Sequence, residues 1–147
     1  MDLLFALFAK DELGVTPAVY AELVAGLREG RSFLHPALEL IESGKLLLLT
    51  LTAKEVVQRF RLPASLNAGE AETIAVCQSR DAALVTNDRR ARNFCRAEAI
   101  EVFDLIDVLR ALWKLRLCSK QQVRQLVADI ETKEKLVIKR KTEIFAK

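Results

Sequence analysis

Segments with helically spaced apolar residues alternate along this chain with short apolar runs, and this pattern predicts helices separated by short strands. An apolar stripe with helical spacing is typical of a helix with one buried face. We predict helices at residues 3–8, 17–30, 36–43, 53–60, 67–79, 105–115 and 120–130, and a short arginine-rich helix after Asp88. Strands are predicted at residues 14–16, 46–51, 82–86 and 100–103. The strands at 46–51 and 82–86 are almost uniformly apolar, which is typical of a sheet covered on both faces. Alternating strands and helices predict an α/β fold with a mainly parallel sheet.

Proline, glycine and serine mark several helix ends. Pro17 opens the second helix, and Gly44 stops the third. Ser119 is placed to cap the last helix. A capping box is not predicted there, because we expect it to require Glu at position 123, where the chain has Val123. His35, beside Pro36 at a helix start, is interpreted as a solvated cap.

Length and composition indicate an ordinary globular protein. The chain has 147 residues, of which 51% are hydrophobic and 29% charged, and this excludes a disordered or collagen-like chain. The apolar runs are far shorter than a membrane-spanning helix needs. The first residues also lack the basic segment with which a secretory signal peptide begins. We therefore expect a cytoplasmic protein without membrane contact.

Cysteine and histidine contribute little to any predicted chemistry. The three cysteines are widely spaced without a CxxC pair, and His35 is the only histidine. A zinc site of His and Cys ligands is therefore nearly excluded, as is a Ser-His-Asp triad unless His35 is its base. Any catalysis must depend on carboxylates.

Positive charge is concentrated at the C-terminus. The net charge is +3, but residues 133–147 alone carry six basic and two acidic side chains. We therefore predict one domain at residues 1–132, close to neutral, and a basic tail at residues 133–147. The tail is either a solvated surface or a contact for phosphates or an acidic partner.

Asp88 is the strongest catalytic candidate. It follows the apolar strand at 82–86, and ligands of parallel sheets bind at the carboxyl ends of the strands. The alternative is that Asp88 only caps the helix after it. The next residues include Arg89, Arg90 and Arg92, which suit phosphate binding but are also common on exposed helices. The scattered glycines form no phosphate-binding loop, so nucleotide binding is disfavoured.

Two further acidic positions are candidates. Glu70 lies at the edge of the apolar stripe of its helix, whereas Glu72 is predicted to face away from that stripe. Glu70 is also explained by a capping box with Asn67. Glu22, taken by itself, is interpreted as a surface glutamate.

Three blocks in the same order resemble the PIN-domain ribonucleases, including their VapC-like toxin branch. The blocks are Thr16–Leu23 (TPAVYAEL), Leu66–Ala75 (LNAGEAETIA) and Ala83–Arg92 (ALVTNDRRAR). Ser119–Val123 also resembles a C-terminal helix start of one prokaryotic branch. The resemblance covers about residues 3–130 and implies a PIN-like parallel sheet flanked by helices.

The resemblance implies a metal-dependent endoribonuclease. Carried over by motif, Glu22, Glu70 and Asp88 become catalytic ligands of Mg²⁺ or Mn²⁺. Glu72 becomes a possible substitute for Glu70. The resemblance further implies that Thr86 and Asn87 order the site and that Arg89, Arg90 and Arg92 bind RNA. Partners implied in the same way are an antitoxin protein and a second copy of the chain in a homodimer.

The chain departs from the family at its N-terminus. The family begins with an apolar strand that ends in Asp, whereas here no strand precedes the first helix, and Met1 falls within or just before that helix. We do not expect Asp2 to replace the missing ligand. The chain is either shorter than its relatives or a degenerate member, and the gap in the sheet must be filled or covered by a partner.

Three functions remain open. The first is a metal-dependent endoribonuclease, as a toxin of a toxin–antitoxin pair. The second is a catalytically degenerate PIN-like module that binds RNA or protein. The third is an interaction module whose acids only cap helices.

Overall fold

A computed structural model describes residues 2–147, apart from the side chain of Asp2. The expectations about Met1 and about the Asp2 carboxylate fall outside these described residues. The chain divides into a larger unit, Glu12–Val102, and a smaller unit of residues 2–11 with Phe103–Lys147. No helix within residues 2–147 is long and apolar enough to cross a membrane.

The larger unit carries most of the predicted elements. Its helices are α2 (Pro17–Arg28), η1 (Ser32–Leu34), α3 (His35–Glu42), α4 (Ala53–Arg61), α5 (Ala68–Arg80) and α6 (Arg89–Ala97). Its strands are β1 (Gly14–Val15), β2 (Leu47–Leu48) and β3 (Leu84–Val85), and the chain leaves the unit within β4 (Val102–Phe103). β1 pairs with β2 in parallel, with Gly14 opposite Leu47, and β3 pairs with β4. The predicted α/β fold is confirmed.

The strands are shorter and less covered than predicted. Each has two residues, and the prediction that residues 46–51 and 82–86 are covered on both faces is wrong. Leu48 is 47% exposed and Val85 is 48% exposed, whereas Leu84 is buried. Because successive side chains of a strand point to opposite faces, one side of β2 and one side of β3 are left open here.

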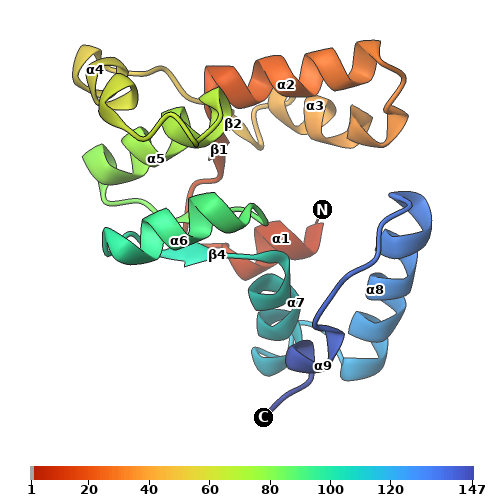
Figure 1. Ribbon diagram of the computed structural model, residues 1–147. Helices are drawn as coiled ribbons and strands as arrows, with labels where there is room; N and C mark the ends of the chain where they lie inside the picture. Colours follow the sequence, from red (N-terminus) through yellow and green to blue (C-terminus); the bar gives the residue numbers. More distant parts are fainter. Residues whose placement is uncertain (1) are drawn as a thin grey trace. The chain divides into compact units, whose positions relative to one another are not determined.

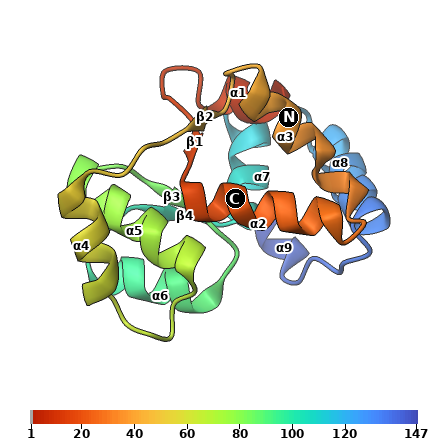
Figure 2. The same ribbon diagram turned by 90° about the horizontal axis from the view of Figure 1, so that it is seen from above.

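The core of the larger unit forms around α5. This helix packs against both α4 and α2 and lies between them in Figure 2. The buried core residues are Leu66, Ala71, Ile74, Cys77, Leu84, Ala91 and Cys95. Burial raises the pKa of the Cys77 thiol to about 11, with a smaller contribution from Cys95, and burial also raises the pKa of Cys95.

An ion pair between an exposed arginine and a buried glutamate joins α4 to α5. Glu55 is fully buried, and its two oxygens accept hydrogen bonds of 2.9 Å from Nε and Nη2 of Arg80. Arg80 also donates to the carbonyl oxygen of Thr50 at 2.8 Å. The Arg80 guanidinium lowers the pKa of Glu55 to about 2, and the Thr52 hydrogen bonds add to this effect. The pair therefore fixes the start of α4 against the end of α5.

The smaller unit is helical. It contains α1 (Asp2–Leu7), α7 (Leu105–Lys114), α8 (Lys120–Lys133) and α9 (Lys141–Ile144). Its buried residues are Ile106, Leu109, Leu112, Val123, Val127, Ile138 and Ile144. The basic C-terminal segment thus contributes two core isoleucines and the short helix α9, which the sequence pattern did not predict. Trp113 Nε1 donates to the carbonyl oxygen of Ile144 at 2.6 Å and holds this segment against α7.

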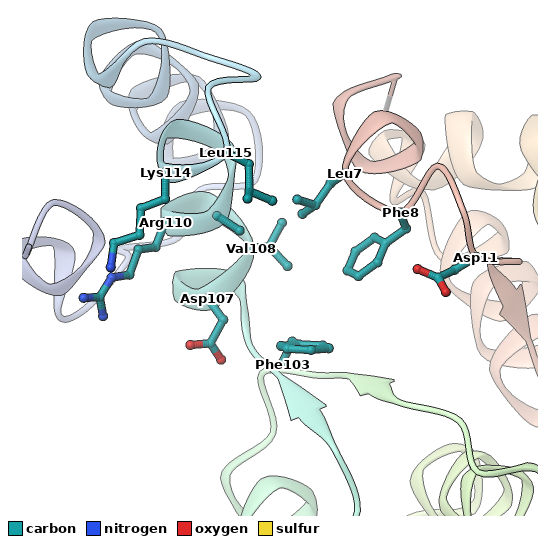
Figure 3. Close-up of a pocket in the computed structure, with 10 residues that line it drawn as sticks. Leu7, Phe8, Asp11, Phe103, Asp107, Val108, Arg110, Lys114 and Leu115 are labelled. Carbon is teal, nitrogen blue, oxygen red and sulfur yellow. The ribbon is translucent and has the colours of Figure 1, made fainter.

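A cavity of about 630 Å³ lies between α1 and α7 in the smaller unit. Figure 3 shows Leu7 and Phe8 facing Val108 and Leu115 across this space. The Phe8 and Phe103 rings lie 6.2 Å apart between centroids. None of the predicted site residues lines this cavity.

Capping boxes begin α4, α5, α7 and α8. The prediction that Ser119 forms no box is wrong, because the partner is Gln122 at the third helical position rather than residue 123. The interpretation of His35 as a cap is also wrong. His35 is the exposed first residue of α3, and Leu34 stands at the N-cap position without a side-chain cap. Gly44 follows α3 with φ +78°, as its predicted stop requires.

Candidate functional site

Glu72 connects three helices of the larger unit. Its Oε1 accepts a hydrogen bond of 2.8 Å from the backbone N–H of Ala18, at the start of α2. Its Oε2 accepts one of 2.8 Å from Arg59 on α4. The carboxylate is buried, so its charge is balanced by the guanidinium and the N-terminal end of α2. Both oxygens of Glu72 therefore have structural partners.

The prediction that Glu72 faces away from the buried stripe is wrong. A helical wheel assumes that one face of a helix is buried, but α5 is covered by α2 as well as by α4. Glu72 is only 4% exposed, whereas Glu70 is half-buried. The burial of Glu72 thus follows from its second neighbour helix and not from the period of its own sequence.

Glu22 lies against the first turn of α5. A Cβ atom placed on Gly69 would be 2.7 Å from Glu22 Oε1, so the carboxylate occupies the space that a side chain would need. Close by, Thr73 Oγ1 donates to the carbonyl oxygen of Gly69 at 2.7 Å and lies 3.4 Å from Thr16 Oγ1. The missing Cβ of Gly69 therefore allows α2 to bring an exposed carboxylate to the start of α5.

Glu70 forms the capping box that the sequence offered as its alternative role. Its Oε2 accepts a hydrogen bond of 3.0 Å from the backbone N–H of Asn67, whose Oδ1 accepts one of 2.8 Å from Glu70 N–H. Only one oxygen of Glu70 is used in this cap. The second oxygen lies outside the cap and is chemically suited to bind a cation.

Asp88 is the N-cap of α6. Its Oδ1 accepts a hydrogen bond of 2.8 Å from Ala91 N–H, as the alternative interpretation predicted. Thr86 Oγ1 accepts a hydrogen bond of 3.2 Å from Asp88 N–H and so helps to fix the turn after β3. Asn87, the other residue predicted to order the site, is exposed within this turn. Oδ2 of Asp88 is not used by the cap.

The predicted RNA-binding arginines extend from the same turn. Arg89 and Arg90 are exposed in the first turn of α6, and Arg92 is half-buried. Arginine side chains bind phosphate oxygens through several N–H donors in a planar arrangement. The start of α6 therefore places two exposed cations directly after the Asp88 carboxylate.

The donor chemistry of Glu22, Glu70 and Asp88 fits a hard divalent cation, because Mg²⁺ and Mn²⁺ bind carboxylate oxygens. The capped acids each keep one oxygen outside the cap. Their geometry fits such an ion less well than their chemistry does, because among residues 2–147 no group of three or more Asp, Glu, His or Cys lies close enough together to hold a metal ion. The three acids thus offer suitable ligands from α2, α5 and the start of α6 without forming a closed cluster.

A family model described as DUF3368, a PIN domain, matches residues 1–143. The chain belongs to the PIN-domain family. Searches of curated proteins and of solved structures gave no match. Membership confirms the PIN-like α/β fold and indicates a nuclease or RNA-binding function in general. PIN domains generally use divalent metals and typically bind RNA.

Two residues that position acidic side chains in the larger unit were not predicted from the sequence. Gly69 makes room for Glu22, and Arg59 balances Glu72. Gly69 itself is a signal in the sequence, because a glycine in the first turn of a helix allows another element to approach closely. Arg59 had no such signal, since its partner lies thirteen residues away on another helix.

Proposed function

We propose that this PIN domain is a metal-dependent endoribonuclease that cleaves RNA phosphodiester bonds. The observation that carries the proposal is the placement of Glu22 against Gly69 in the first turn of α5, the residue directly before Glu70. Family membership supports it. Asp88 adds a third carboxylate at the start of α6.

Glu22, Glu70 and Asp88 would hold Mg²⁺ or Mn²⁺. When bound, such an ion lowers the pKa of a water and offsets the charge that develops on the phosphate. In this proposal Thr86 and Asn87 hold the turn that presents Asp88, while Arg89, Arg90 and Arg92 bind phosphates of the RNA. Glu72 is not a substitute ligand in this scheme, because its oxygens bind Ala18 and Arg59.

The test separates capping from catalysis. Asn caps a helix as well as Asp, and Gln serves in a capping box as well as Glu, so Asp88→Asn and Glu70→Gln should keep the fold. We expect both variants to lose cleavage of a labelled single-stranded RNA in Mn²⁺ or Mg²⁺, with EDTA abolishing wild-type cleavage.

The matched control is Asp107→Asn. Asp107 has the same capping-box role at the start of α7 that Glu70 has at the start of α5, and the Asp107→Asn variant should keep full activity. Unchanged cleavage by folded Asp88→Asn would refute the proposed site.

A second candidate function is RNA binding without cleavage. It is favoured by the lack of a gathered three-acid group within residues 2–147. It predicts salt-sensitive RNA binding through the arginines of α6 and the basic segment at residues 133–147, with no cleavage in any divalent metal. Unchanged affinity after replacing Arg89, Arg90 and Arg92 by Ser and neutralising the basic segment would contradict it.

The toxin role is a further part of the proposal. It is supported by the resemblance of the three sequence blocks to the VapC-like branch. Induced synthesis of the chain should then arrest bacterial growth, Asp88→Asn should relieve the arrest, and an antitoxin protein should bind the chain. A homodimer is proposed on the same resemblance. Its test is a molar mass that doubles with concentration in light scattering.

A further inference from the structure

Phe60, on α4, is one of the most exposed large apolar side chains of the larger unit. It is 76% exposed, although its neighbours in the sequence help to bind α4 to α5. A single exposed apolar residue is ordinary. Phe60 differs because Arg59 lies against its ring and because Lys54 and Arg61 are exposed on the same helix, although Val56 and Val57, one turn back, are exposed as well.

The ring of Phe60 lies next to an ordered cation. The guanidinium carbon of Arg59 is 5.4 Å from the ring centroid, within cation–π range. Arg59 is held in turn by Glu72, which also binds the start of α2. The ring therefore sits on a helix that is fixed to the same part of α5 that carries Glu70.

Charge on α4 suits a polyanion. Lys54 and Arg61 are exposed on this helix, and its only acid, Glu55, is buried and paired with Arg80. The exposed surface of α4 thus combines an aromatic ring and two valines, Val56 and Val57, with basic side chains. Figure 1 shows α4 at the outer side of α5, and within residues 12–102 no other helix lies on its far side.

We propose that Phe60 stacks on a base of the single-stranded RNA that this PIN domain binds. The inference rests on the proposed RNA-directed function and extends it to a position away from the acids. Aromatic rings and guanidinium planes are the groups on which unpaired bases stack, and such stacking tolerates any base sequence. Arg61 and Lys54 would contact the flanking phosphates. The stacked base fixes which part of the strand reaches the acids.

The experiment measures binding in EDTA, so that cleavage does not interfere. The probe is a fluorescent single-stranded RNA of about ten nucleotides, compared with an abasic strand of the same length. We expect Phe60→Leu to weaken binding of the RNA at least about fivefold and to leave binding of the abasic strand unchanged. Phe60→Tyr should bind as the wild type does. Tryptophan emission of Phe60→Trp, after subtraction of the wild-type signal, should be quenched by the RNA and not by the abasic strand.

The matched control is Phe33→Leu. Phe33 is 49% exposed in the same unit, so this variant removes an exposed aromatic ring away from α4 and should bind RNA normally. Because both rings are exposed, both variants should fold, which circular dichroism checks.

Each other result is decisive. Equal RNA binding by Phe60→Leu and wild type would overturn the inference, as would an equal loss on the abasic strand. Self-association that depends on Phe60 while RNA affinity does not would overturn it in favour of a protein contact. RNA binding that depends on Phe60 without cleavage in any metal would support the inference and reject the nuclease. A folded wild type that binds no RNA would reject both.

Discussion

Glu55 gives a quantitative test of how the larger unit is held together. We consider Glu55→Gln, which removes the charge and keeps the shape of the side chain. The pKa of Glu55 is lowered from 4.5 to about 2 by Arg80, which corresponds to at most about 3 kcal/mol of folding free energy. Arg80 is 36% exposed, and solvent screening reduces this to about 1–2 kcal/mol. We therefore expect the variant to be less stable than wild type by about 1–2 kcal/mol at pH 7.

The pH dependence of this stability difference tests whether the charge of Glu55 causes it. The folded pKa of Glu55 lies below that of an unfolded glutamate, so its contribution is complete above pH 4.5 and is lost as the pH falls towards 2. Urea unfolding of both proteins, followed by far-ultraviolet circular dichroism, should show their stabilities converging over that range. Glu39→Gln is the control, because Glu39 is exposed on α3. Equal stabilities at pH 7, or a difference that persists unchanged at pH 2, would refute the reasoning.

Three further predictions concern other buried groups. Glu72→Gln should lower the free energy of unfolding by about 1–3 kcal/mol in urea titrations, because it weakens the bond to Arg59; a variant as stable as wild type would contradict this role. Ile144→Ala should lower stability by about 2–5 kcal/mol in thermal unfolding, since Ile144 is fully buried, and a smaller loss would show that the C-terminal segment is not part of the core. A thiol reagent at pH 8 should leave Cys77 unmodified until the chain unfolds, and rapid labelling of the folded protein would argue against its burial. The free energy of unfolding should also fall between pH 9 and 11, because the Cys77 thiol loses its proton more easily in the unfolded chain than in the folded protein.

Helices were predictable because their ends are encoded locally. Asn67 and Glu70 lie within one turn, and the same holds for Ser119 with Gln122, so each start is determined by a few adjacent residues. The partner of Ser119 is Gln122 and not Val123, and this interaction is local as well. The strands were less predictable, since the exposure of Leu48 depends on which elements cover the sheet.

The capping roles of the candidate acids were predictable from the sequence, and their contacts with distant helices were not. Asp88 and Glu70 take the capping roles that their positions suggested. The burial of Glu72 and the approach of Glu22 to Gly69 both depend on helices distant in sequence. A single helical period carries no information about a second packed neighbour.

The contrast between capped helices and very short strands has a consequence for the order of folding. Each capping box closes a loop of three residues, whereas pairing Gly14 with Leu47 closes a much longer one, and loop-closure entropy rises with length. Helical contacts should therefore form first and β1–β2 pairing last. Pulsed hydrogen exchange during refolding would show this as protection of the helical amides before those of Leu47 and Leu49, which donate to the segment of β1. A sheet that forms late and from two-residue strands leaves little unpaired edge to capture another chain while the protein folds.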